Sequence, residues 1–388
     1  MTRHRRFTLF AALGAALVLL VPACSSNGGA GDSSTPAAGS TSAPSSAAAS
    51  SAGSDTSAPG TSGTSAASAS AGQSSPAGGP SADLSSVKIA AVFSGPVTDA
   101  DYNQLGLLAL QAAEKQGATT TYTESVAVPD AERVIREYVA DGNTVVWTHG
   151  SQFYDATAKV AKDNPDVHFI AEFDGHPDGQ PDNVWIFDRQ FHLGFYAIGV
   201  LASKLSKSGK VGYVGGLSLP FSYSEVHAMQ QAIKDTGAST TINAVWTGDF
   251  NDPTKAQQIS TQLINDGADV IVGSLNNGAV GTFKAAEAAS GTNVWVTAKY
   301  TDKSSLDSGG GHYAGTVLYD FAKPLGDVLG KIVGGEGTGY YPLGFTTGVT
   351  IQMSDDVPAD VQQAVSDTMA KVDDGSIKVT LDTSKIGG

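Results

Sequence analysis

The sequence predicts an α/β protein built from two doubly wound, Rossmann-like lobes. Short strands rich in Val and Ile alternate with helical segments in two successive series, 87–172 and 193–298. Such alternation is typical of parallel sheets with helices on both faces. The roughly 300 residues after position 86 are enough for two such lobes.

The first series begins with the apolar run 87–93, which ends at a Ser-Gly-Pro turn. Gly117 and Gly142 follow helical patterns and are expected to end them. Val134, Ile135 and Tyr138 fall on one face of the second helix. The expected strands are 87–93, 119–126, 144–148 and 167–172, and the expected helices are 102–116, 129–142 and 154–162.

The second series starts with a helix of small and apolar residues and repeats the same rhythm. Its expected helices are 193–205, 224–235, 253–266 and 279–289, and its expected strands are 210–216, 240–246, 269–273 and 293–298. Ligands of doubly wound sheets bind beyond the carboxyl ends of the strands. With two lobes, we expect that edge to form a cleft between them.

The N-terminal region has the features of a secretory signal. Basic residues at 3–6 precede an apolar run at 7–21, and Cys24, the single cysteine, follows Ala23. This arrangement resembles a bacterial lipobox, so we expect residues 1–23 to be a signal peptide and Cys24 to carry lipid. The alternative is an ordinary signal peptide with an unmodified cysteine.

Residues 24–86 are expected to form a tether between the lipid and the folded domain. The segment consists almost entirely of Ser, Ala, Gly, Thr and Pro and has no aromatic residue. It cannot bury enough apolar surface to offset the entropy lost on ordering. These features predict a protein held by lipid on the extracellular face of the cell membrane.

Composition excludes several functional classes. Thirty-eight acidic residues outnumber 23 basic ones, which argues against nucleic acid as a partner. A single cysteine excludes an intrachain disulfide, and the seven histidines show no metal-binding spacing. No cofactor or metal is therefore expected.

Several segments together resemble the basic membrane lipoprotein family, also called PnrA-like. The turn 99–104 (Asp-Ala-Asp-Tyr-Asn-Gln), the helix start 129–133, and the segments 155–169, 194–216 and 264–271 match it in order. The resemblance implies a type I periplasmic-binding-protein fold whose lobes are joined by hinge strands. It also implies a monomeric substrate-binding protein that carries a purine nucleoside to an ABC permease.

In the first lobe, the resemblance points to five ligand-binding residues. Asp99, Tyr102 and Asn103 follow the first strand, where Tyr102 would stack on a flat ligand and Asn103 could pair with the N6/N7 edge of adenine. Phe153 could complete a sandwich, and Asp174 could accept a hydrogen bond from a ribose hydroxyl. The alternatives are that Asn103 caps the helix, Tyr102 and Phe153 are core residues, and Asp174 belongs to an Asp-Gly turn.

In the second lobe, the candidates are Phe250, Asn277, Tyr300 and Asp302. Phe250 and Asn277 follow expected strands, although Asn277-Gly278 also suits a turn into a helix. Nucleoside-binding members of the family carry Asp-x-Asp where this chain has Tyr300-Thr301-Asp302. The missing first acid makes a nucleobase such as adenine a comparable alternative to a nucleoside.

The leading functional hypothesis is thus a solute receptor for an ABC importer. An enzyme is the rival class, but the chain has no Gly-x-Ser-x-Gly elbow, Walker loop or Rossmann glycine signature. A surface sensor or adhesin on the same fold is the other alternative. The expected lobes are 87–190 with 302–340, and 191–301 with 341–388, with hinges near 188–190, 300–303 and 341–345.

Overall fold

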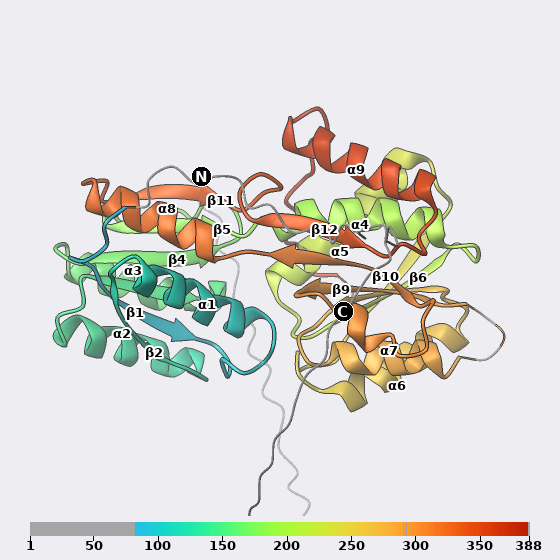
Figure 1. Cartoon of the computed structure of the whole chain (residues 1–388), viewed down its shortest axis with the longest axis horizontal. Helices are drawn as coiled ribbons and strands as arrows, with labels where there is room; N and C mark the ends of the chain where they lie inside the picture. Colours follow the sequence, from blue (N-terminus) through green and yellow to red (C-terminus); the bar gives the residue numbers. More distant parts are fainter. Residues whose placement is uncertain (1–81, 290, 292, 387–388) are drawn as a thin grey trace, which may run out of the picture. The chain divides into compact units, whose positions relative to one another are not determined.

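The computed structural model describes residues 82–289, 291 and 293–386, which form two six-stranded sheets (Figure 1). The expected signal peptide, Cys24 and the tether up to residue 81 lie outside the described residues. Among the described residues, no helix combines the length and apolar character needed to cross a membrane. We call the part that contains the first sheet lobe 1 and the part that contains the second sheet lobe 2.

Lobe 1 is built on the strand order β11-β5-β4-β3-β1-β2, in which all neighbours are parallel. Helices α1 and α8 pack together on one face, and α2 and α3 pack together on the other. The strands are β1 (Lys88–Phe93), β2 (Thr119–Thr123), β3 (Val145–His149), β4 (His168–Phe173), β5 (Val184–Asp188) and β11 (Gly339–Pro342). The helices are α1 (Tyr102–Lys115), α2 (Ala131–Ala140), α3 (Tyr154–Asp163) and α8 (Ala322–Val333), with short 3₁₀ turns η1 (Val128–Asp130) and η2 (Ser151–Phe153).

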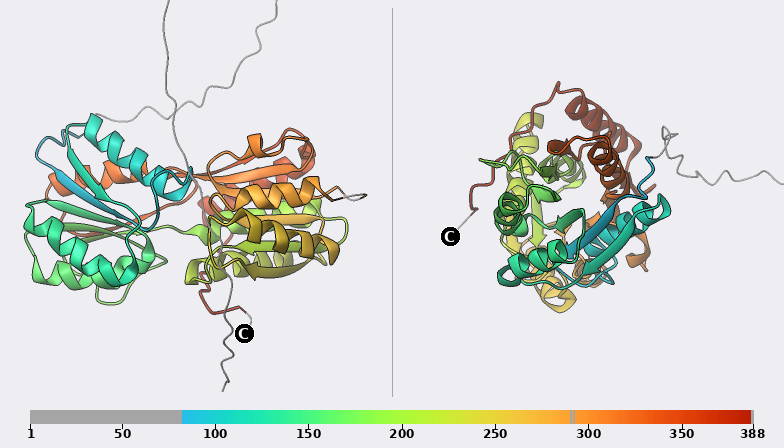
Figure 2. Two further views of the ribbon diagram at one scale, coloured as in Figure 1. Left: turned by 90° about the horizontal axis from the view of Figure 1, so that it is seen from below. Right: turned by 90° about the vertical axis from the view of Figure 1, so that its left-hand side faces the viewer.

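Lobe 2 has the strand order β12-β10-β9-β8-β6-β7, parallel except for the antiparallel pair β10–β12. Helix α4 packs against both α5 and α9, and α6 packs against α7, so helices lie on both sides of the sheet (Figure 2). The strands are β6 (Lys210–Gly215), β7 (Thr241–Trp246), β8 (Val270–Ser274), β9 (Trp295–Tyr300), β10 (Tyr313–Tyr319) and β12 (Val349–Met353). The helices are α4 (Phe191–Leu205), α5 (Pro220–Thr236), α6 (Pro253–Asn265), α7 (Ala279–Glu287) and α9 (Ala359–Asp373), with the 3₁₀ turn η3 (Ser304–Leu306).

The α/β class and the two doubly wound lobes expected from the sequence are confirmed. The elements after residue 300, namely β10, α8, β11, β12 and α9, are additions to the expected ones. Strand β5 is a further addition. All five of its residues are buried, as in a central parallel strand, but a loop rather than a helix connects it to β4. The strand–helix alternation used to predict the other elements is therefore interrupted here.

The assignment of segments to lobes differs from the expected one in the C-terminal third. Residues 302–340 were expected in lobe 1, but β10 pairs with β9 in the second sheet. Only α8 and β11 return to the first sheet, and β12 and α9 belong to lobe 2. The chain therefore crosses between lobes near 189–190, 320–321 and 343–348, and the expected hinge at 300–303 instead links two strands of one sheet.

The folded domain also begins earlier than position 87. Leu84 is fully buried in the core of lobe 1, and its N–H donates to the carbonyl of Gln116 at 3.0 Å. Residues 82–86, which the composition assigned to the tether, are therefore part of the structure next to the end of α1.

Candidate ligand-binding site

A cavity of about 310 Å³ lies between the carboxyl ends of the two sheets and is lined by residues from both lobes. The lining combines aromatic rings, aliphatic side chains, amides and a single guanidinium. Its members are Ser94, Gly95, Tyr102, Asn103, Val126, Ala127, Val128, Gln152, Arg189, Leu217, Leu219, Phe221, Phe250, Asn251, Asn276 and Tyr300.

Tyr102, at the start of α1, forms an aromatic wall whose position is fixed by a buried network. Its hydroxyl donates to the carboxylate of Glu172, and its ring stacks on His149 with the centroids 3.9 Å apart. His149 in turn bonds Glu172 and the carbonyl of Tyr102. Burial, and then the charge of Glu172, raise the pKa of Tyr102 well above its usual value, so the phenol remains protonated.

Lobe 2 supplies two nearly parallel rings, Phe221 and Phe250, with an interplanar angle of 18° and centroids 6.1 Å apart. Phe250 lies directly over Gly216, where an added Cβ would be 2.0 Å from its Cδ1 atom. Phe250 can therefore lie against the backbone at position 216 because that position has no side chain.

A buried cation, Lys299, lies behind the ring of Phe221. Lys299 on β9 is fully buried and pairs with Glu225, and its Nζ is 3.5 Å from the ring centre of Phe191. Burial lowers the pKa of Lys299 to about 8, and the charge of Glu225 opposes that shift. Glu225 also accepts from the Tyr213 hydroxyl at 2.6 Å, so the pair is anchored to the sheet of lobe 2.

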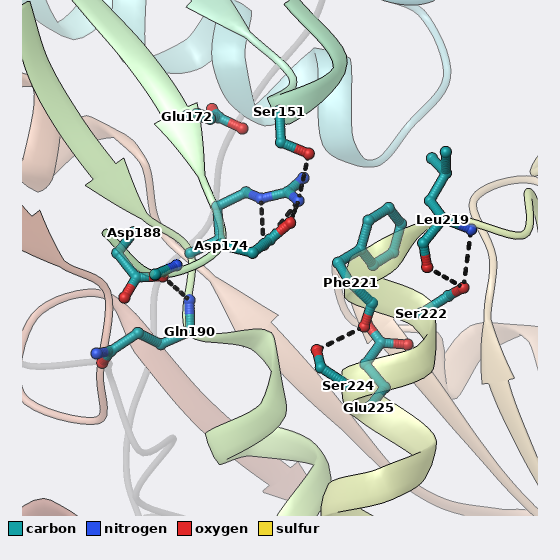
Figure 3. Close-up of polar contacts among 12 residues, drawn as sticks. Ser151, Glu172, Asp174, Asp188, Gln190, Leu219, Phe221, Ser222, Ser224 and Glu225 are labelled. Atoms are coloured by element: carbon teal, nitrogen blue, oxygen red, sulfur yellow. Dashed lines mark hydrogen bonds and ion pairs between the residues drawn. The ribbon is translucent and has the colours of Figure 1, made fainter. Parts of the chain in front are cut away.

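Arg189 follows β5 at the first crossing between lobes and is 2% exposed. Its guanidinium forms a salt bridge with Asp174 at 2.7 Å and donates to Ser151 Oγ at 2.8 Å; Figure 3 labels both acceptors. Its Cζ atom also lies 4.6 Å and 4.9 Å from the ring centres of Phe191 and Phe221. Arg189 therefore connects polar groups of lobe 1 with the aromatic rings of lobe 2.

Asp99 organises the turn before α1. Its carboxylate accepts from the backbone N–H groups of Asn103 and Gln104, so Asp99, two residues before the N-cap Asp101, satisfies the first turn of the helix and Asn103 does not cap it. It also accepts from the side-chain amides of Asn103 at 2.8 Å and of Asn276, in lobe 2, at 3.1 Å. The Oδ1 atom of Asn103 accepts from the N–H of Gly95 at 3.2 Å.

A second polar contact joins the lobes beside the cavity. Asp101, which is fully buried, pairs with Lys303 at 2.5 Å and accepts from Thr301 Oγ1 at 2.8 Å. The Thr301 hydroxyl also lies 3.0 Å from the carbonyl of Ala100. Burial raises the pKa of Asp101 to about 6, and the charge of Lys303 opposes that shift.

The structure places four of the nine residues suggested by the sequence on the cavity. Tyr102, Asn103, Phe250 and Tyr300 line the cavity. Asp99 lies behind Asn103 and holds it in place. Asp174 is outside the lining and acts by orienting Arg189, not as a surface facing the cavity.

Three predicted residues lie away from the cavity. Phe153 is fully buried in the core between α2, α3 and the first sheet, which agrees with the alternative that it is a core residue. The preceding residue, Gln152, lines the cavity instead. Asn277 is exposed, whereas the preceding Asn276 is buried and lines the cavity. Asp302 is exposed and accepts from the N–H of Ser304 at 2.8 Å.

Sequence reasoning missed Arg189 and Phe221. Arg189 is the first residue after β5, so it would have been found by the carboxyl-end rule had that strand been expected. Phe221 is the second residue of α5 and had no comparable signal, because residues 217–221 do not directly follow the strand.

Comparisons with known proteins agree with this geometry. The family model for ABC transporter substrate-binding proteins of the PnrA-like type matches residues 86–380. A purine-binding protein of Brucella abortus (strain 2308) is 30% identical over 200 residues, which are 50% of this chain and 56% of that protein. A putative ABC transporter glucose-binding protein of Haloferax volcanii is 26% identical over 311 residues, 79% of this chain and 75% of that protein.

Among solved structures, an ABC transporter solute-binding protein from Conexibacter woesei DSM 14684 is similar with a TM-score of 0.61 and 25% identity. The match covers 76% of this chain and 98% of that one. The match to the Brucella relative spans little more than half of that protein's length. The family model, in contrast, covers nearly all of both lobes. The chain therefore belongs to the PnrA-like family of ABC transporter substrate-binding proteins.

Proposed function

We propose that the chain binds a purine, as the free base or the nucleoside, between its lobes and delivers it to an ABC permease. The observation that carries the proposal is that four aromatic side chains, those of Tyr102, Phe221, Phe250 and Tyr300, line one small cavity. Stacking a base on an aromatic side chain contributes about 1–3 kcal/mol. Convergent polar groups on an otherwise apolar lining are typical of small-molecule sites.

Two features favour the free base over the nucleoside. The cavity volume of about 310 Å³ is near the lower end of the roughly 300–1,000 Å³ found for small-molecule sites. Among the described residues that line the cavity, none is an Asp or Glu that could accept from ribose hydroxyls. Tyr300 occupies the place of the first acid and presents a ring instead.

A sugar is the second ligand class, because the Haloferax relative is named as glucose-binding. Recognition of a sugar requires polar partners for several hydroxyl groups, since each buried hydroxyl without a partner is costly. The aliphatic lining at Val126, Val128, Leu217 and Leu219 supplies none. The lining is thus better suited to a flat heterocycle.

The location rests on the N-terminal sequence. We propose that Cys24 carries lipid and that the Ser/Ala-rich segment after it tethers a monomeric receptor to the extracellular face of the cell membrane. Several acyl chains are needed for stable anchoring, which a lipid-modified N-terminal cysteine can provide. Cys24→Ala should abolish attachment of lipid, as measured by labelling cells with a radioactive fatty acid, and absence of label from the unsubstituted protein would contradict the anchor.

The ligand itself is tested by native mass spectrometry of the purified protein, followed by denaturation and identification of what is released. We expect a purine, and we expect thermal unfolding to shift upward when purines are added to the empty protein. Phe250→Ala is the matched variant and should reduce that shift. Release of a sugar, together with no shift from any purine, would refute the purine and retain the transport role.

A further inference from the structure

We propose that Arg189 makes this site select purines with a carbonyl group at position 6 over those with an amino group there. The inference rests on the proposed purine ligand and specifies its chemistry. It follows from which hydrogen-bonding groups at the cavity are already used within the protein and which remain for a ligand.

Arg189 offers an available donor. Its Nε and Nη2 atoms donate to Asp174, and Nη2 also donates to Ser151 (Figure 3). Nη1 carries two further N–H groups, and the Tyr102 hydroxyl lies close enough to accept from the guanidinium, which leaves at least one N–H of Nη1 for a ligand. Arg189 also lines the cavity. The neighbouring Tyr102 hydroxyl already gives its proton to Glu172. A guanidinium nitrogen can only donate, so its ligand partner must be an acceptor.

The position of this donor is fixed. The bidentate contact with Asp174 and the rings of Phe191 and Phe221 hold the guanidinium plane. At 2% exposure, Arg189 cannot swing into water to avoid an unsuitable ligand. A ligand that presents a donor here would leave an N–H group buried without a partner, which is costly.

The residue expected to read adenine is not available for that role. Adenine is recognised by an amide that accepts from N6 and donates to N7. In Asn103, Oδ1 accepts from the N–H of Gly95, and Nδ2 donates to Asp99. Asn276 likewise donates its Nδ2 to Asp99. The Oδ1 atom of Asn103, which would have to accept from N6 of adenine, is therefore already engaged by Gly95 and Ser94 within the protein.

A 6-oxopurine fits these groups better than a 6-aminopurine. Its O6 and N7 atoms are both acceptors, and this edge is the one that Arg side chains recognise in guanine. Gln152 has no side-chain hydrogen bond among the described residues and can rotate to serve either a donor or an acceptor elsewhere on the ring. Arg189 is therefore the residue that distinguishes a carbonyl group from an amino group at position 6.

The experiment compares hypoxanthine with adenine, which differ in the group at position 6, by calorimetric titration of the purified protein. We expect hypoxanthine to bind at least about 10-fold more tightly, within the range of about 5- to 150-fold typical of such contacts. Inosine and adenosine provide the same comparison if the site takes nucleosides.

Arg189→Lys keeps a positive charge beside Asp174 but loses the fixed planar donor. It should weaken hypoxanthine at least about 10-fold and leave adenine within about 3-fold, which removes most of the preference. Arg133→Lys, on the exposed face of α2, is the control and should change neither affinity. Thermal unfolding establishes that each variant is folded.

The outcomes separate the two proposals. Adenine binding as tightly as hypoxanthine to the unsubstituted protein would overturn the role of Arg189 and leave the purine receptor standing. Equal weakening of both bases by Arg189→Lys would also overturn it, because Arg189 would then only support the cavity. Binding of none of the four purines would refute the proposed function and this inference with it.

Discussion

Asp101 and Lys303 form a buried ion pair between the lobes, with Lys303 Nζ 2.5 Å from Asp101 Oδ1. Asp101 is fully buried and Lys303 is 7% exposed. The other carboxylate oxygen of Asp101 is buried without a hydrogen-bond partner among the described residues. Removal from water therefore outweighs the attraction of Lys303, and burial raises the pKa of Asp101 to about 6.

This shift predicts how stability depends on pH. The folded state holds the Asp101 proton more tightly than the unfolded chain, whose value is near 3.8. The stabilising contribution is complete below about pH 4 and is lost as the pH rises through about 6, at up to ~1.4 kcal/mol per pH unit. Urea unfolding of the protein and of Asp101→Asn should show their difference falling over that window.

The same comparison contains its control, because Asn does not titrate and other groups cancel in the difference. Above about pH 7 the difference should be flat, since Asp101 is then charged in both states. A difference that instead rose with pH would mean that the attraction of Lys303 outweighs burial.

The Lys299–Glu225 pair predicts strong energetic coupling. Lys299→Met or Glu225→Gln alone leaves a buried charge without its opposite and should destabilise the protein by about 3–5 kcal/mol. The double variant should lose much less than the sum of the two. Urea unfolding of all four proteins gives the coupling free energy.

The matched control is the exposed pair Lys323–Asp327 on α8, where the two side chains are 51% and 39% exposed. Lys323→Met should cost less than about 1 kcal/mol. Additive losses at Lys299 and Glu225 would show that the buried pair is not coupled.

Gly216 predicts an effect on ligand binding through Phe250. In Gly216→Ala the new Cβ would meet the ring of Phe250, so the ring must shift within the cavity. We expect purine affinity to fall about 10-fold and stability to fall by about 1–3 kcal/mol. Gly309→Ala is the control, because no atom lies within 4 Å of its added Cβ. Equal affinities in both variants would show that Phe250 does not contact the ligand.

Up to residue 298, the elements other than β5 were predicted well because local signals determine them. No element was expected beyond that residue, where β10, α8, β11, β12 and α9 lie. Helix α1 was expected at 102–116 and spans Tyr102–Lys115, ended by Gly117 in the left-handed conformation. The rule that ligands meet the carboxyl ends of strands also suggested Phe250, and the family resemblance suggested Tyr102 and Tyr300; all three line the cavity. Tyr102 begins α1, Tyr300 ends β9, and Phe250 lies in the loop that follows β7.

The rest of the site depends on which of two adjacent residues faces the cavity and on contacts between residues that are distant in the sequence. Phe153 and Gln152 are neighbours in the turn η2, and the direction of that turn decides which one faces the cavity. The role of Arg189 depends on Asp174, which lies beside it because the two residues follow the neighbouring strands β5 and β4. Such relationships come from tertiary packing, so sequence pattern alone does not determine them.

Asn276 and Asn277 provide a test of this distinction between adjacent residues. Asn276 is buried, and its side-chain amide donates to Asp99 in the other lobe at 3.1 Å, whereas Asn277 is exposed. Asn276→Ala removes a contact between the lobes, so the arrangement that encloses the cavity becomes less populated. Apparent affinity falls in proportion to the population of the binding-competent form.

We therefore expect Asn276→Ala to weaken purine binding about 10-fold, equivalent to ~1.4 kcal/mol, and Asn277→Ala to leave it unchanged. Calorimetric titration measures both affinities, and small-angle scattering of the ligand-free proteins reports whether Asn276→Ala is more open. Weaker binding in Asn277→Ala with Asn276→Ala unaffected would place the contact one residue later, where the sequence first suggested it. Because the two substitutions are chemically identical, a difference between them can arise only from the position of each side chain in the fold.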